Sequence, residues 1–159
     1  QVGIGAVLFS ELSVRRNRDV VFEWDKALDF EGDTGPYVQY AHARMCSILR
    51  KAGREAPAEA DTALLTLPEE WALASKLEAF PQAVRRAGEE CEPFLVAASL
   101  LDLCACFSSY YSAGMRDESL RVLCPDPDVA AARLALVDAT RRVVAAGLDL
   151  LGMAAPQRM

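Results

Sequence analysis

Four side chains suited to nucleic-acid binding share one side of a predicted helix in the first third of the chain. At about 100° per residue, one stripe of this helix contains Tyr37, Tyr40, Arg44 and Lys51. Tyrosine rings and a guanidinium plane stack on unpaired bases, and the cations neutralise phosphates. The stripe therefore predicts a surface for single-stranded RNA. The alternative interpretation is that the tyrosines only flank the core, with their hydroxyls in water.

The same helix has a second face that must be buried. Asp33 or Thr34 can cap its start, Pro36 suits its first turn, and Gly53 can end it. The apolar stripe, about a quarter circle from the tyrosines, consists of Val38, Ala41, Met45, Ile48, Leu49 and Ala52. The only histidine of the chain, His42, falls nearer the polar back of the wheel. We therefore favour a capping or helix-packing role for His42 over contact with RNA.

The remaining residues offer little for catalysis or metal binding. No Ser/His/Asp or Cys/His arrangement is found, because His42 is the only histidine and stands alone, and no glycine-rich phosphate loop occurs. The five cysteines, at positions 46, 91, 104, 106 and 124, include no CxxC pair. That spacing argues against a zinc site and against a disulfide framework. We expect reduced thiols in a cytoplasmic protein, and no catalytic residue, metal or cofactor in this chain.

Length and composition indicate one ordinary globular domain. The chain has 159 residues, of which 52% are hydrophobic and 25% charged. Its net charge of −6 argues against a protein that holds nucleic acid by overall charge, because such domains usually carry a basic excess. Any RNA binding must therefore depend on a local patch.

Helices are predicted along most of the first half. Residues 2–12 form a short apolar helix or an extended segment, and a loop follows in which residues 20–22 could form a short strand. Thr66 and Glu69 have the spacing of a capping box. Pro81 should break or kink the helix that this box begins. The apolar positions of that helix are Trp71, Leu73, Leu77 and Phe80.

The second half contains the predicted core. The stretch from Pro93 is apolar nearly all round through Phe107, which is typical of the central helix of a bundle. We expect it to be too short, and too interrupted by Asp102 and several serines, to span a membrane. A last helix should begin at a cap on Asp126 and end at Gly152. The predicted fold class is all-α, an antiparallel helical bundle.

Several segments together resemble one known family. The stretch "FEGDTGPYVQYAHARMCSILRKAG" closely resembles the start of the DALR-type anticodon-binding domain of arginyl-tRNA synthetases, especially those of the eukaryotic-like branch. "LEAFPQAV" and "EPFLVAASLLDLCACFSSYY" resemble its middle helices, and "RLALVDATRRVVAAGLDLLGMAAPQRM" resembles its last helix and C-terminus. The resemblance implies the helical bundle of class I synthetases over residues 33–159. Residues 1–32 would be the connection from a catalytic domain.

The resemblance also implies a set of site residues. The "PYxQYxHxR" pattern of the family lines the anticodon-loop site, as do a tyrosine near the end of the central helix and a terminal methionine. In this sequence the corresponding residues are Tyr37, Tyr40, Arg44, Tyr111 and Met159. Tyr110 sits beside Tyr111, so the resemblance leaves open which of the two makes the contact. Lys51, on the same stripe as the tyrosines, is the candidate for a phosphate contact.

The implied protein is a longer enzyme of which this chain is one piece. The HIGH-like and KMSK-like ATP signatures of the family do not occur here, so we expect no enzymatic activity from this piece alone. The chain opens at Gln1 without an initiator methionine, which we interpret as a cut inside a longer polypeptide. The parent would ligate arginine to its tRNA with ATP and Mg²⁺. The implied partners are the arginine tRNA, through its anticodon loop, and the enzyme's own catalytic domain, but no membrane.

Two other functions stay open on the sequence. One is the anticodon-binding domain of a cysteinyl- or glycyl-type synthetase, against which "GDTGPYVQYAHAR" and "LLGMAAPQRM" speak. The other is a helical protein-interaction module, which suits the acidic balance.

One further structural expectation concerns the end of the chain: after Gly152, "MAAPQRM" should turn back toward the tyrosines, so that Met159 can pack against a base.

Overall fold

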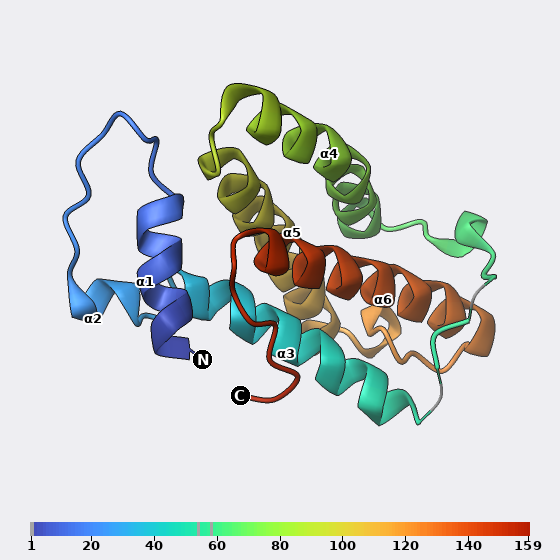
Figure 1. The fold of residues 1–159 in the computed structure, drawn as a ribbon. Helices are drawn as coiled ribbons and strands as arrows, with labels where there is room; N and C mark the ends of the chain where they lie inside the picture. The colour runs from blue at the N-terminus through green and yellow to red at the C-terminus, as the bar shows by residue number, and fades with distance from the viewer. Residues whose placement is uncertain (1, 54, 58) are drawn as a thin grey trace.

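The computed structural model describes residues 2–53, 55–57 and 59–159, and these residues contain helices but no β-strand (Figure 1). The predicted all-α class is confirmed. The α-helices are α1 (Val2–Leu12), α2 (Trp24–Ala27), α3 (Gly35–Ala52), α4 (Pro68–Glu90), α5 (Phe94–Arg116) and α6 (Pro127–Leu150). Two short 3₁₀ turns, η1 (Thr62–Leu64) and η2 (Glu118–Leu120), lie in the connections. The short strand predicted at residues 20–22 is wrong, because that segment is irregular and has no partner strand to pair with among the described residues.

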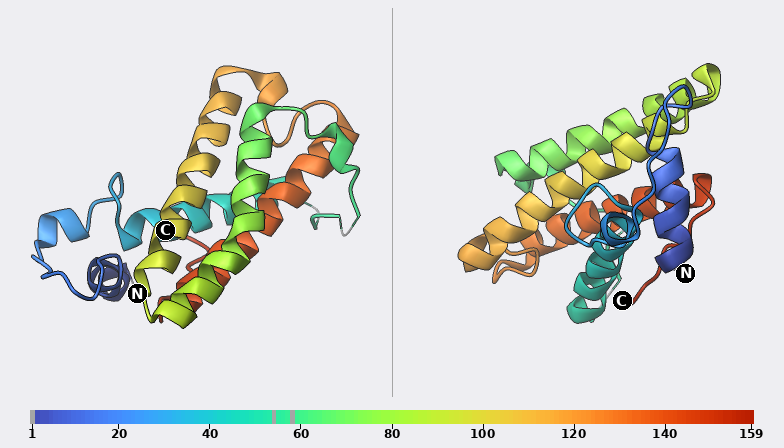
Figure 2. Two further views of the ribbon diagram at one scale, coloured as in Figure 1. Left: turned by 90° about the horizontal axis from the view of Figure 1, so that it is seen from above. Right: turned by 90° about the vertical axis from the view of Figure 1, so that its left-hand side faces the viewer.

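The helices form a bundle around α5. Helices α4 and α5 are joined by a tight turn and pack as an antiparallel hairpin, while α3 and α6 run in opposite directions beneath it (Figures 1 and 2). Helix α1 stands across the first turns of α3. Side chains from all five long helices meet in one core, which includes Phe9, Met45, Leu73, Leu100, Phe107 and Leu134. The arrangement leaves one side of α3 facing solvent, beside the end of α5.

Helix α5 corrects one sequence-based expectation. Its 23 residues are long and apolar enough to cross a membrane by length and composition, so the expectation that it is too short is wrong. Its buried side chains instead pack against α4, α6 and α3. The central helix of a soluble bundle has this same composition, because it is surrounded by other helices.

Most helix ends lie where local chemistry predicts them. The Thr34 hydroxyl accepts the Tyr37 N–H at 3.1 Å, and α3 ends at Gly53 with φ of 62°. At the start of α6, Asp126 accepts the N–H groups of Asp128 and Val129, at 3.0 and 3.2 Å. Both caps are confirmed predictions, and the first fixes the start of α3, the helix that carries Tyr40 and Arg44.

Helix α4 departs from its predicted pattern in three ways. Its N-cap is Leu67 rather than the predicted Thr66, so the helix begins at Pro68. The Glu70 carboxylate, one position after the predicted Glu69, accepts the N–H of Leu67 at 3.0 Å. It runs on through Pro81, because packing against α5 along its length outweighs one lost hydrogen bond. Trp71 is not part of its buried face, since 62% of its surface is exposed.

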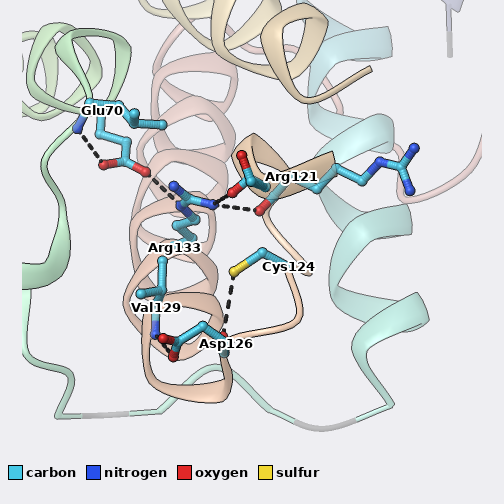
Figure 3. A network of polar contacts seen from close by, with 8 residues as sticks. Glu70, Arg121, Cys124, Asp126, Val129 and Arg133 are labelled. Carbon is cyan, nitrogen blue, oxygen red and sulfur yellow. Dashed lines mark hydrogen bonds and ion pairs between the residues drawn. The ribbon is translucent and has the colours of Figure 1, made fainter. Parts of the chain in front are cut away.

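A buried ion pair ties α4 to α6. Arg133 on α6 donates through Nε to the Glu70 carboxylate at 2.7 Å, and through Nη1 to the carbonyls of Ser119 and Arg121, at 2.6 and 2.9 Å (Figure 3). The side chains of Arg133 and Glu70 are 5% and 0% exposed. A buried pair of this kind is tolerated only when its other hydrogen-bonding groups are satisfied too, and here the loop around η2 provides the partners.

Candidate nucleic-acid interface

Helix α3 and the end of α5 together place one arginine between two tyrosines. Tyr40 and Arg44 are four residues apart on α3 and therefore lie on the same side of the helix. The guanidinium carbon of Arg44 is 4.6 Å from the Tyr40 ring centre and 4.8 Å from the Tyr111 ring centre. Its Nη2 also donates to the Tyr40 hydroxyl at 2.6 Å. Both rings are thus within cation–π distance of one cation.

These three side chains border an open cavity of about 460 Å³, here called the tyrosine cavity. Met159 forms part of its wall, with 47% of its surface exposed, and Tyr40 is 38% exposed. The other lining residues are Ala43, Ser47, Arg50 and Arg158. Among the described residues, the lining contains three arginines and no carboxylate side chain. A chain of net charge −6 therefore has a local cationic, aromatic surface, as an RNA site would require.

Tyr37 lies on the other side of Tyr40. It is half-buried, and its hydroxyl shares a hydrogen bond of 3.2 Å with Ser108 of α5. Burial raises the pKa of this hydroxyl, although the bond to Ser108 works against the rise. Tyr37 borders a neighbouring cavity of about 430 Å³, which it shares with Tyr40, Arg44 and Phe30. Tyr40 and Arg44 therefore form a ridge between two cavities, with Tyr37 on one side and Met159 on the other.

The structure distinguishes the two adjacent tyrosines of α5. Tyr110 is 1% exposed and belongs to the core, and its hydroxyl has no hydrogen-bond partner among the described residues. Burial raises the pKa of Tyr110 well above its usual range. Tyr111, about 100° further round the helix, faces Arg44 and the tyrosine cavity. Tyr111 is thus the one of the pair in position to contact a ligand.

Met159 reaches the cavity because α3 holds the C-terminal segment by its backbone. Gln39 donates to the Ala154 carbonyl at 2.8 Å, His42 contacts the Pro156 carbonyl through Nδ1 at 2.9 Å, and Arg50 donates to the Gln157 carbonyl at 2.9 Å. We call these three side chains the tail clasp. The predicted return of "MAAPQRM" toward the tyrosines is confirmed.

The start of the C-terminal segment is set by close packing against α3. After Gly152, whose φ is 71°, the Met153 side chain is buried against Gly35. A Cβ at position 35 would lie 2.9 Å from Met153 Cε and 2.5 Å from the Gly5 carbonyl oxygen. Only a glycine allows α1, α3 and the C-terminal segment to meet so closely at this point.

His42 is buried, so its predicted place on the polar back of the helix is wrong, and its partner is the irregular C-terminal segment rather than a helix end or another helix. Because a carbonyl oxygen only accepts hydrogen bonds, Nδ1 must carry the proton. Burial lowers the pKa of His42, although the bond to Pro156 opposes the shift. The imidazole is therefore neutral at pH 7 and acts as a fixed donor to the C-terminal segment.

Lys51 is exposed but does not line the tyrosine cavity. It borders a separate cavity of about 330 Å³ on the far side of Tyr111, together with Met115. The structure thus brings four predicted residues round one cavity, Tyr40, Arg44, Tyr111 and Met159, with Tyr37 and Lys51 in the adjoining ones. Contact of any of them with RNA stays a prediction.

Two residues near the ridge were not predicted. Phe30 packs edge-on against Tyr40, with ring centres 6.2 Å apart, and Arg50 lines the tyrosine cavity. Phe30 lies in a loop, and a loop has no hydrophobic periodicity from which the position of its side chain could be predicted. Arg50 lies six residues after Arg44, and a wheel centred on the tyrosines does not select it. The described residues contain no cluster of three His, Cys, Asp or Glu side chains placed to hold a metal.

Comparison with known proteins finds a match over most of the chain. Residues 38–159 match the family described as the DALR anticodon binding domain. The chain is 43% identical over 159 residues to an arginine–tRNA ligase of Haloarcula marismortui. The match covers all of this chain and 26% of that protein. An arginine–tRNA ligase of Frankia casuarinae is 45% identical over 157 residues, with 26% of its length covered.

Solved structures show the same correspondence. The Thermus thermophilus arginyl-tRNA synthetase superposes with a TM-score of 0.91 at 44% identity, over 99% of this chain and 26% of that one. The arginyl-tRNA synthetase of Plasmodium falciparum superposes with a TM-score of 0.83 at 25% identity, over 98% of this chain and 27% of that one. The chain therefore spans about a quarter of the length of these relatives.

Proposed function

The chain belongs to the DALR anticodon binding domain family, and from this premise we propose that it holds the anticodon loop of a tRNA at the tyrosine cavity. The observation that carries the proposal is the Arg44 guanidinium between the Tyr40 and Tyr111 rings, beside an open cavity that Met159 helps to form. Stacking surfaces beside a local excess of cations are what an unpaired RNA loop requires.

Each side chain has a distinct part in this proposal. A loop base turned out of its stack would pack on the exposed Tyr40 ring or the half-buried Tyr111 ring, and the Met159 thioether would pack against a neighbouring base. Arg44 is already held by the two rings and keeps further N–H donors for a phosphate or a base edge. Tyr37, held by Ser108, would line the second cavity for the adjoining nucleotide.

The parent protein in this proposal is an arginine–tRNA ligase, and the bound partner is the arginine tRNA. Support comes from the relatives, which are arginine–tRNA ligases about four times longer than this chain. Residues 1–32 would connect the bundle to the catalytic domain, and residues 33–159 would form the anticodon-binding domain. ATP and Mg²⁺ would be used by the catalytic part in the cytoplasm. This chain would grip the distant end of the tRNA and so help to place the acceptor end.

Filter binding with tRNA transcripts tests the proposal. We expect the 159-residue chain to prefer the arginine transcript, and to lose that preference when the anticodon bases are substituted. Preference for a cysteine or glycine transcript would assign the domain to another synthetase. Absence of binding to every tRNA would favour a protein-interaction module instead.

A further inference from the structure

Another cavity, of about 640 Å³, lies against the C-terminal half of α3 and the middle of α6. Among the described residues, three arginines line it, Arg50, Arg141 and Arg142, and we call it the arginine cleft. We propose that the arginine cleft binds the phosphodiester backbone of the tRNA next to the anticodon loop, an inference that rests on the proposed function. Nothing in the tyrosine stripe predicts this cleft, because two of its arginines belong to α6.

Two of the guanidinium groups of the cleft are held in place by one carboxylate. Asp138 is buried and accepts from Arg141 Nε and Arg142 Nε, each at 2.8 Å, with one oxygen for each arginine. Each guanidinium has five N–H donors, so both arginines retain donors beyond those that meet Asp138. The Arg142 side chain is 71% exposed and its remaining donors can reach solvent. Asp138 thus orients two cations while neutralising only one charge.

The charges of the lining leave an excess of positive charge. In the part of the lining that the structure describes, three arginines face two carboxylates, Asp138 and Glu55. Arg50 uses its Nη1 on the Gln157 carbonyl and forms no ion pair with a carboxylate among the described residues. Cys46 adds no negative charge near pH 7, because burial raises the pKa of its thiol. In a chain of net charge −6, a fixed cationic cleft is suited to an anion.

The lining indicates which part of RNA would bind. The described lining residues include no aromatic ring, and their apolar contribution comes from Leu49, Cys46 and Ala56. A base would therefore find no stacking surface there, whereas arginine planes match phosphate oxygens well. The tyrosine cavity has the opposite character, with two rings beside its arginines. We assign bases to the tyrosine cavity and backbone phosphates to the arginine cleft.

The two cavities adjoin at one side chain. Arg50 lines both of them, and successive residues of the C-terminal segment form their walls, Gln157 in the arginine cleft and Arg158 with Met159 in the tyrosine cavity. A strand whose base enters the tyrosine cavity would bring its neighbouring phosphates to Arg50. From there the backbone can continue to Arg141 and Arg142 without leaving the cationic surface.

The test is the salt dependence of tRNA binding by the Arg142→Gln variant. Arg141 remains to pair Asp138 in this variant, so the fold should be retained and thermal melting unchanged. Loss of one phosphate contact should reduce the slope of log K against log salt concentration by about 0.7–0.9, and affinity at about 0.1 M salt by about 5- to 10-fold. The same factor should apply to tRNA with a substituted anticodon. Arg86→Gln, which removes another exposed arginine from an ion pair of α4, is the matched control and should change neither quantity.

Three other outcomes are informative. Wild-type protein that binds tRNA, with an Arg142→Gln variant of identical slope and affinity, would overturn the arginine cleft and leave the proposed function standing. A loss restricted to the native anticodon would show that Arg142 reads bases and would also overturn it. If the wild-type chain binds no tRNA, the proposed function fails, and this inference fails with it.

Discussion

Arg44 and Arg133 are both attached to long helices of the same bundle, and their surroundings are opposite. Arg133 is 5% exposed and meets a buried carboxylate and two backbone carbonyls (Figure 3). Arg44 meets two aromatic rings and a hydroxyl at the surface, and no carboxylate among the described residues. One guanidinium has its donors directed into the protein, whereas the other keeps donors for a ligand.

The difference separates residues that stabilise the fold from residues that serve binding. A buried charge that loses its partner is left uncompensated in a medium of low dielectric, so the Glu70–Arg133 pair governs stability. A half-buried cation stacked on rings adds little to stability, but it needs no desolvated partner and keeps donors for an anion. Substitutions around Arg133 should therefore lower stability and leave tRNA binding unchanged, whereas substitutions around Arg44 should weaken tRNA binding and leave stability unchanged.

The largest expected effect is on stability. Glu70→Ala leaves Arg133 without its carboxylate and should lower the free energy of unfolding by about 3–5 kcal/mol, as measured by urea denaturation. The affinity for tRNA per folded molecule should not change. Glu90→Ala, which removes the exposed partner of Arg86, is the control and should cost no more than about 1 kcal/mol. Equal losses in the two variants would show that burial does not distinguish the pairs.

The next effect is on binding alone. Tyr40→Ala removes a stacking ring that is already 38% exposed, and should weaken tRNA binding by about 1–3 kcal/mol. The melting temperature should stay nearly constant. Tyr40→Phe keeps the ring, removes the hydroxyl that accepts from Arg44, and should retain most of the affinity. A large loss of stability with unaltered binding per folded molecule would instead place Tyr40 with the core residues.

Removal of the chain end should have a smaller effect. Deletion of Arg158 and Met159 removes the thioether and one cation from the tyrosine cavity, and should weaken tRNA binding by about 1 kcal/mol. Helicity measured by circular dichroism should not change, and arginylation by the full-length enzyme should fall. Unchanged binding and charging would show that the chain end is not part of the site.

The tail clasp can be separated from general stability by a double-mutant cycle. His42→Ala should cause part of the same loss of tRNA binding, because the imidazole holds the Pro156 carbonyl. In the protein that lacks Arg158 and Met159, the same substitution should have little further effect on binding. Additive losses would show that His42 does not act through Met159.

The smallest expected effect is a pH dependence of stability. Burial lowers the pKa of His42 in the folded state below the unfolded value of about 6.5. The unfolded chain therefore binds the proton more readily, and stability should be complete above pH 6.5 and fall as the pH drops through the folded pKa. Urea denaturation of the wild-type protein and of His42→Gln should show this loss of stability at low pH only in the wild type. The same pH dependence in both would assign it to other groups.

Features that depend on neighbouring residues in the chain could be predicted from the sequence. The four-residue spacing of Tyr40 and Arg44 places them on one side of a helix wherever that helix packs. The caps at Thr34 and Asp126 and the stops at Gly53 and Gly152 act within one turn of backbone. The all-α class follows from the same local patterns, because periodicity and capping are properties of short segments.

Features that depend on distant residues were decided only by the tertiary structure. Tyr110 and Tyr111 have the same chemistry, and packing of α5 in the bundle places the first in the core and the second beside Arg44. The tail clasp joins residues more than 100 positions apart, and the Glu70–Arg133 pair joins residues 63 positions apart. Pro81 stays helical because α5 supports α4 along its length. In each case the free energy comes from burial and hydrogen bonds between segments, and a local pattern contains no information about which segments meet.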